Sequence, residues 1–148
     1  MHGAGHEGGR RARTENIILA VGLGKACKLA LASHPNPKIK ELRDYFWHEL
    51  KNYFTEHIVL NGHPEERLPN TLNVSFVGKV GQDLLAKIPG LAASTGSTCH
   101  AGTVELSPVL KAMKVDEHIG KGTIRFSLGR YITKEEIDLA LQWLKEAV

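Results

Sequence analysis

Cysteine is scarce in this sequence, and several other features are absent. Only Cys27 and Cys99 occur among 148 residues, so no disulfide framework is expected and a reducing, cytoplasmic compartment fits best. No apolar run approaches the roughly 20 residues that cross a bilayer, and no secretory signal is recognisable, so we expect no membrane partner. The formal net charge of +3 gives no indication of a nucleic-acid partner. The eight histidines match no zinc-binding spacing, so no metal site is predicted.

Helical and strand patterns follow one another along the chain and predict an α/β (α+β) fold, a small mixed sheet covered by helices. The first 14 residues, rich in glycine and arginine, are expected to form a loop, and residues 15–148 one domain. Asn36 and Pro37 are typical of a helix start, and Thr133 with Glu136 forms a capping-box pattern. Helices are expected over 15–32, 36–53, 80–90, 106–115 and 133–148, and strands over 57–62, 66–78, 91–94 and 122–130.

The stretch STGSTCHAG, residues 94–102, places Cys99 among small residues. That composition is typical of an exposed, mobile loop, where a thiol can act as a nucleophile or carry sulfur. The alternative is an unreactive surface cysteine. His100 is adjacent and a candidate for tuning the thiol, whereas Cys27 falls on the apolar side of its helix and is expected in the core.

Two further segments carry candidate binding residues. In GTIRFSLGR, residues 122–130, the alternation places Arg125 opposite the apolar face, where a guanidinium can hold a carboxylate in bidentate fashion; a structural ion pair is the alternative. In GAGHEGGRRARTEN, residues 3–16, glycine N–H groups and the Thr14 hydroxyl can bind an anion; a flexible tail is the alternative.

Together and in this order, GAGHEGGRRARTEN, STGSTCHAG and GTIRFSLGRYITKEEID resemble the C-terminal part of cysteine desulfurases. These are pyridoxal 5'-phosphate enzymes of the class V aminotransferase group, close to selenocysteine lyases. The resemblance implies the small C-terminal domain of a fold-type I pyridoxal-phosphate enzyme. It implies that Cys99 takes sulfur from L-cysteine as a persulfide, that Arg125 binds the substrate carboxylate, and that Thr14 reaches the cofactor phosphate across a dimer.

The resemblance also implies what the chain lacks. Arg13 stands where the family usually has glycine, and no lysine occurs in the family's cofactor-binding context. We therefore expect a truncated or split desulfurase that is inactive alone and needs a large-domain or homodimer partner and a sulfur-acceptor protein, for iron–sulfur clusters or other uses. A non-catalytic sulfur carrier using Cys99 is the alternative, and a gene remnant is a third. Cysteine and selenocysteine both remain open as substrate.

Overall fold

The structure is a computed structural model that describes residues 5–10, 15–33, 36–100 and 103–148. It divides into two units, Met1–Pro35 and Asn36–Val148, which are described separately. Residues 11–14, at the boundary expected from the sequence, lie outside the described part, so that boundary stays a prediction.

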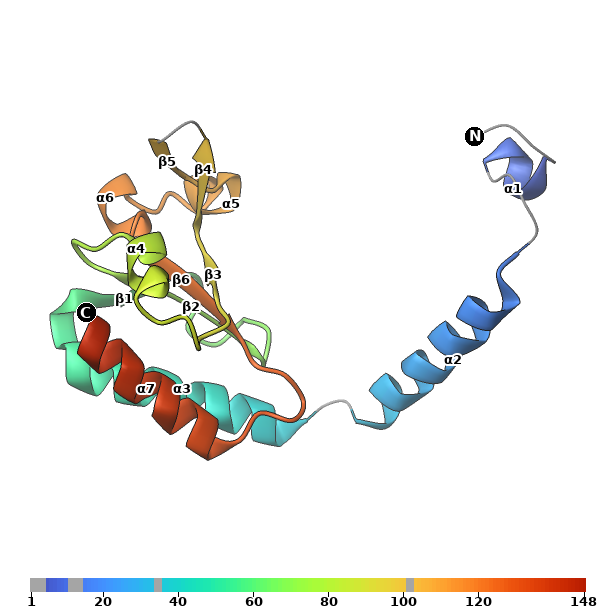
Figure 1. The fold of residues 1–148 in the computed structure, drawn as a ribbon, viewed down its shortest axis with the longest axis horizontal. Helices are drawn as coiled ribbons and strands as arrows, with labels where there is room; N and C mark the ends of the chain where they lie inside the picture. The colour runs from blue at the N-terminus through green and yellow to red at the C-terminus, as the bar shows by residue number, and fades with distance from the viewer. Residues whose placement is uncertain (1–4, 11–14, 34–35, 101–102) are drawn as a thin grey trace. The chain divides into compact units, whose positions relative to one another are not determined.

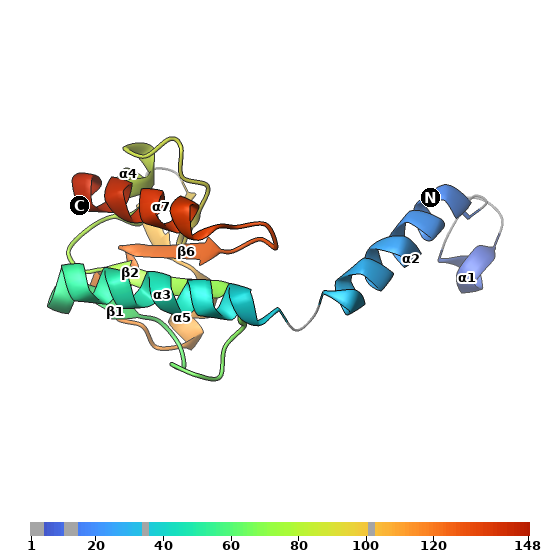
Figure 2. The ribbon, with the colours of Figure 1, turned by 90° about the horizontal axis from the view of Figure 1, so that it is seen from below.

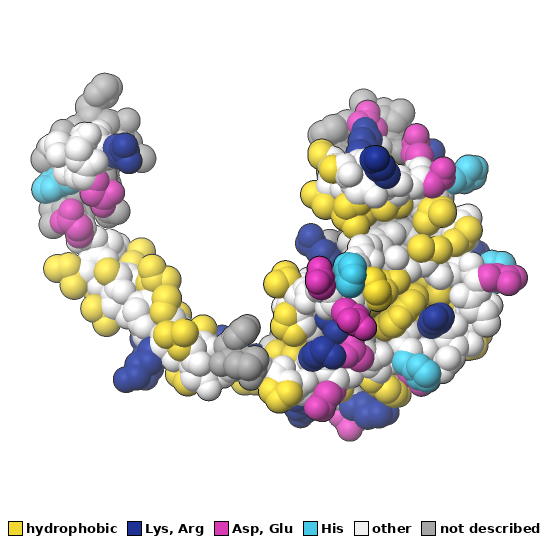
Figure 3. Space-filling view, turned by 180° about the vertical axis from the view of Figure 1, so that it is seen from behind, with side chains coloured by type: hydrophobic (Ala, Val, Ile, Leu, Met, Phe, Trp, Pro, Cys, Tyr) yellow, Lys and Arg dark blue, Asp and Glu magenta, His cyan; other side chains and the backbone are white. Residues whose placement is uncertain are grey.

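The first unit contains a single turn, α1 (His6–Gly9), and the helix α2 (Ile17–Ala32). Asn16 begins α2, because its Oδ1 accepts a hydrogen bond from the Leu19 N–H at 3.1 Å. Every residue of α2 is exposed, although all but Lys25 and Lys28 are apolar or glycine. The space-filling view shows the apolar side chains along it (Figure 3). The expectation that Cys27 lies in a core is wrong, because the residue is exposed and none of the described residues of this unit covers that helix.

The second unit is built on a four-stranded sheet in the order β1-β2-β6-β3, with every neighbouring pair antiparallel (Figure 1). Its strands are β1 (Ile58–Leu60), β2 (Thr71–Phe76), β6 (Thr123–Ser127) and β3 (Ser94–Thr95). The strand expected over 91–94 begins only at Ser94, so three of its four residues are connecting chain. The expected small sheet covered by helices is confirmed.

Two long helices, α3 (Pro37–Phe54) and α7 (Lys134–Ala147), lie side by side on one face of this sheet (Figure 2). The Thr133–Glu136 capping box is confirmed, whereas Asn36 makes no side-chain cap on α3. Phe46 of α3 packs edge-on against Phe126 of β6, with ring centroids 4.9 Å apart. The buried residues that join the two helices to the sheet are Leu42, Phe46, Leu50, Phe54, Leu72, Val74, Phe76, Ile124, Phe126, Ile137, Leu141 and Leu144.

Shorter elements complete the unit. They are η1 (Thr55–His57), α4 (Gly81–Ala86), α5 (Pro108–Ala112), α6 (Glu117–Gly120), and a two-stranded hairpin of β4 (Ser97–His100) and β5 (Thr103–Leu106). Among the described residues, no single helix has both the length and the apolar composition needed to cross a membrane; Ile17–Ala32 and Pro37–His57 meet these criteria only when taken together.

We predict that Gly122→Ala destabilises this unit, because a Cβ at Gly122 would collide with the backbone carbonyl of Phe76 at the end of β2. Overpacking against a fixed backbone costs about 1–3 kcal/mol. Gly129→Ala is the matched control, since nothing lies within 4 Å of its Cβ position. Urea unfolding of both variants checks this, and equal stabilities would contradict it.

We also predict that iodoacetamide alkylates Cys27 in the native chain about as fast as in the urea-unfolded chain, because the residue is exposed on α2. Mass spectrometry of the Cys27 peptide gives both rates, with Cys27→Ser as the control. Strong protection in the native chain would mean that another surface covers α2 in solution.

Candidate functional site

The face of the sheet opposite α3 and α7 is polar. Side chains alternate along a strand, so the residues between the apolar core positions share this open face. The residues on it are Thr71, Asn73 and Ser75 of β2, Ser94 of β3, and Thr123, Arg125 and Ser127 of β6. The candidate site lies on this face because it contains the sheet's only charged side chain, Arg125.

Arg125 lies in the middle of β6 and is exposed, as the alternation predicted. Its register partners are Asn73 on β2 and Ser94 on β3. Within the described part of the chain it makes no hydrogen bond or ion pair, so the structural ion pair considered from the sequence is not found there. The guanidinium is therefore available to an external anion.

Small side chains surround Arg125 and leave space for a ligand. A hollow of about 250 Å³ is lined by Ala92, Ala93, Ser94, Arg125 and Ser127. A free guanidinium binds a carboxylate through two parallel N–H···O bonds, and the two serine hydroxyls add further hydrogen-bonding groups. The arrangement suits a small carboxylate-bearing molecule.

Cys99 lies on β4, opposite Val104 of β5, rather than in an irregular loop. The expectation of an irregular loop is therefore wrong for residues 97–100, because their backbone forms antiparallel hydrogen bonds with β5. The hairpin lies at the end of the unit away from α3 and α7 (Figure 1). The strand that carries Cys99 is therefore not part of the layer formed by α3 and α7.

The hairpin and the arginine are connected through β6. Gly96, at the root of the hairpin, donates its N–H to the Thr123 carbonyl at 3.0 Å and accepts from the Ser107 N–H at 2.9 Å. Thr123 precedes Arg125 by two residues on the same face of β6. The root of the Cys99 hairpin is therefore bonded to the strand that carries Arg125, whereas Thr14 and Arg13 lie outside the described residues.

Sequence reasoning missed a buried polar cluster beneath the hairpin. The side chains of Ser75 and Thr123 are fully buried, with their hydroxyl oxygens 2.7 Å apart, and Asn61 is 6% exposed beside them. From the sequence, Asn61 falls only within the strand expected over residues 57–62. The alternation around Leu72 already places Asn73 and Ser75 on one face, but nothing local indicates that Asn61 meets them.

Arg67 borders this cluster, and its Nη2 donates to the Asn61 carbonyl at 3.3 Å. Burial, and then the nearby charge of Arg43, lowers the pKa of Arg67. Its Nε atom is buried and has no hydrogen-bond partner in the described part of the chain. Arg67 therefore holds the segment that contains Asn61.

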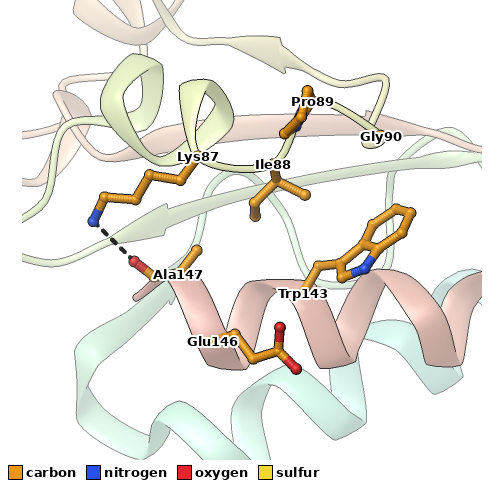
Figure 4. Close-up of a pocket in the computed structure, with 7 residues that line it drawn as sticks. All are labelled: Lys87, Ile88, Pro89, Gly90, Trp143, Glu146 and Ala147. Atoms are coloured by element: carbon orange, nitrogen blue, oxygen red, sulfur yellow. Dashed lines mark hydrogen bonds between the residues drawn. The ribbon is translucent and has the colours of Figure 1, made fainter.

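Another hollow, of about 370 Å³, lies between α7 and the segment after α4 and contains none of the candidate residues (Figure 4). There Lys87 Nζ donates to the Ala147 carbonyl at 3.1 Å, and Gly90 packs so closely on the Trp143 indole that a Cβ would lie 2.8 Å from it. These are packing contacts between the chain and its last helix. Within the described ranges, no three His, Cys, Asp or Glu side chains are grouped to hold a metal ion.

Comparison with known proteins identifies the family. The model of the class-V aminotransferase family matches residues 3–140. The chain is 38% identical to the cysteine desulfurase IscS of Edwardsiella ictaluri (strain 93-146) and 40% identical to that of Pasteurella multocida (strain Pm70), in each case over all of the chain and 37% of the relative. It thus spans little more than a third of the length of these relatives.

Solved structures show the same partial coverage. A NifS-like protein superposes with a TM-score of 0.82 at 33% identity, over 99% of this chain and 37% of that one. A NifS-like protein from Rickettsia africae ESF-5 gives 0.84 at 27% identity, over 99% of this chain and 39% of that one. The chain therefore belongs to the class-V aminotransferase family, and it is cysteine desulfurase-like within that family.

Proposed function

We propose that this chain is the sulfur-accepting and carboxylate-binding part of a cysteine desulfurase, corresponding to the C-terminal portion of the longer relatives. The observation that carries the proposal is Arg125, free of partners among the described residues and placed over a hollow of small side chains. The root of the hairpin that carries Cys99 is hydrogen-bonded to the strand of Arg125, through Gly96 and Thr123. In this role Arg125 holds the carboxylate of L-cysteine, and Cys99 receives the sulfur.

The proposed reaction transfers one sulfur atom. The Cys99 thiolate attacks the sulfur of L-cysteine; an S–S bond forms at Cys99 and the C–S bond of the substrate breaks. The carbon that loses sulfur keeps the bonding pair, takes up a proton and becomes the methyl group of L-alanine. The product on the protein is the Cys99 persulfide, whose outer sulfur then passes to an acceptor protein.

The family depends on pyridoxal phosphate, which supplies an electron sink for such chemistry. The described residues do not fit this group. Among the described residues, those that line the hollow at Arg125 include no lysine to bind the aldehyde and no carboxylate to pair with the ring nitrogen. The cofactor would therefore be held by a second portion of polypeptide, and Thr14 would reach its phosphate.

The helix α2 supports a requirement for such a partner. A helix that is apolar on all sides is stable in water only when other protein or lipid covers it. Ile18 is 84% exposed and Leu31 is 79% exposed, and the helix carries only two charged residues. We propose that the cofactor-bearing portion covers α2, which predicts that Cys27 becomes protected when the two are combined.

We predict that the chain alone releases no sulfide from L-cysteine and that turnover appears when the cofactor-bearing portion of a relative is added. Cys99→Ser should then abolish persulfide formation. Arg125→Ala should raise KM for L-cysteine about tenfold or more, because a charged hydrogen-bonding pair is lost. Arg125→Lys is the matched control that keeps the charge but not the bidentate fork. Turnover by the chain alone, or full activity of the Cys99→Ser mixture, would contradict the proposal.

A second candidate function is that of a sulfur carrier without catalysis, which is favoured by the position of the hairpin away from the long helices. We predict that a carrier gains the mass of one sulfur atom on Cys99 after incubation with an active desulfurase and L-cysteine. Mass spectrometry of the Cys99 peptide checks this, with Cys27 as the internal control. An unchanged Cys99 peptide would count against the carrier function.

A further inference from the structure

A buried amide, Asn61, lies between the two parts of the candidate site. It follows β1 and is 6% exposed. Its Nδ2 donates to Asn73 Oδ1 at 2.9 Å and to Ser75 Oγ at 2.8 Å, with Thr123 Oγ1 more distant at 3.4 Å. The two N–H bonds of this amide thus have two well-placed acceptors, as expected for a buried polar group.

The first branch leads from Asn61 to Arg125. Asn73 is directly opposite Arg125 in the β2–β6 register, and both side chains are on the open face. Side chains opposite one another on antiparallel strands approach to about 5 Å. Because Asn61 holds Asn73 Oδ1, the Asn73 amide has a fixed orientation beside the guanidinium. Asn61 therefore fixes the side chain that lies opposite Arg125 on β2.

The second branch leads from Asn61 to the root of the Cys99 hairpin. Ser75 Oγ accepts from Asn61, so its own hydrogen is free to donate to Thr123 Oγ1, 2.7 Å away. Thr123 in turn packs against Gly96, where an added Cβ would lie 2.6 Å from Thr123 Cβ and Cγ2. The Gly96 N–H also bonds the Thr123 carbonyl at 3.0 Å. The position of Thr123 thus fixes the point from which the hairpin leaves the sheet.

We propose that Asn61 is a positioning residue. It holds Asn73, beside the carboxylate-binding Arg125, and the root of the Cys99 hairpin in one fixed relation. A substrate bound at Arg125 would then present its sulfur in constant register with the arriving thiol. Asn61 touches neither the substrate nor the reacting sulfur. The proposal rests on the roles given above to Arg125 and Cys99.

Three variants of the full chain test it. Asn61→Leu removes both branches, and Thr123→Val removes only the hydroxyl of the second. Asn70→Leu is the matched control, because Asn70 Nδ2 bonds the Leu128 carbonyl at 3.4 Å and does not belong to the cluster. The NMR measurements are hydrogen exchange of the Gly96 and Ser107 amides, which form the root, and the Arg125 Nε–Hε resonance.

We expect Asn61→Leu to speed exchange at both root amides about tenfold beyond the change in global stability, and to shift the Arg125 resonance. Thr123→Val should speed exchange equally and leave the Arg125 resonance in place, and Asn70→Leu should do neither. The proposal is overturned if Asn61→Leu behaves like Asn70→Leu, or if Thr123→Val leaves the root amides unchanged. If Asn61→Leu does not fold, Thr123→Val carries the test alone.

Turnover in the reconstituted enzyme separates this proposal from the function on which it rests. Thr123→Val changes only the root of the Cys99 hairpin and not the surroundings of Arg125. We therefore expect kcat to fall severalfold while KM for L-cysteine stays within about twofold. If Thr123→Val changed kcat and KM by equal factors, the positioning role would be overturned. If instead Cys99→Ser retains activity, the proposed function fails while the exchange result at Gly96 and Ser107 still stands.

Discussion

The antiparallel pairing of β2 with β6 is the interaction on which the rest of this structure depends. Its register sets Leu72 against Phe126 and Val74 against Ile124 on one face, where α3 and α7 cover them. A shift by one residue would turn every one of these apolar side chains to the other face. The same register sets Asn73 beside Arg125 on the open face. One set of backbone hydrogen bonds therefore creates both the core and the candidate site.

The open face is polar in two different ways along its length. At Arg125 the sheet is exposed and its neighbours are small, so the guanidinium is available to a ligand. At Thr123 the hairpin root and α5 cover the sheet, and the hydroxyl groups there are satisfied by one another and by Asn61. An unsatisfied buried hydroxyl would cost about 1–3 kcal/mol of stability. The cluster is therefore required by the fold, and it also links the surroundings of Arg125 to the root of the Cys99 hairpin.

Several features could be predicted from local sequence, because each is encoded within a few residues. The period of apolar residues predicted α2, α3 and α7, and the Thr133 and Glu136 side chains predicted the start of α7. Alternation along the strand predicted that Arg125 lies on the exposed face. The expectations that failed concern what lies against a segment rather than the segment itself. Cys27 is on the apolar side of a helix, yet it is exposed because no part of its own unit packs there. The hairpin at Cys99 depends on pairing with residues 103–106, which the small, polar composition of 94–102 did not indicate.

The sequence by itself determined the class of fold, the order of the long helices and of the sheet strands, and the family, since periodicity, capping patterns and ordered motifs are local properties. It also identified Cys99 and Arg125 as the residues to examine. Only the tertiary structure decided that the hairpin root is bonded to β6, the strand of Arg125. It also decided that Asn61 is linked through hydrogen bonds to the neighbours of both. The physical reason is that these contacts join residues separated by up to 62 positions, as between Asn61 and Thr123, and follow from strand register and burial rather than from any neighbouring residue.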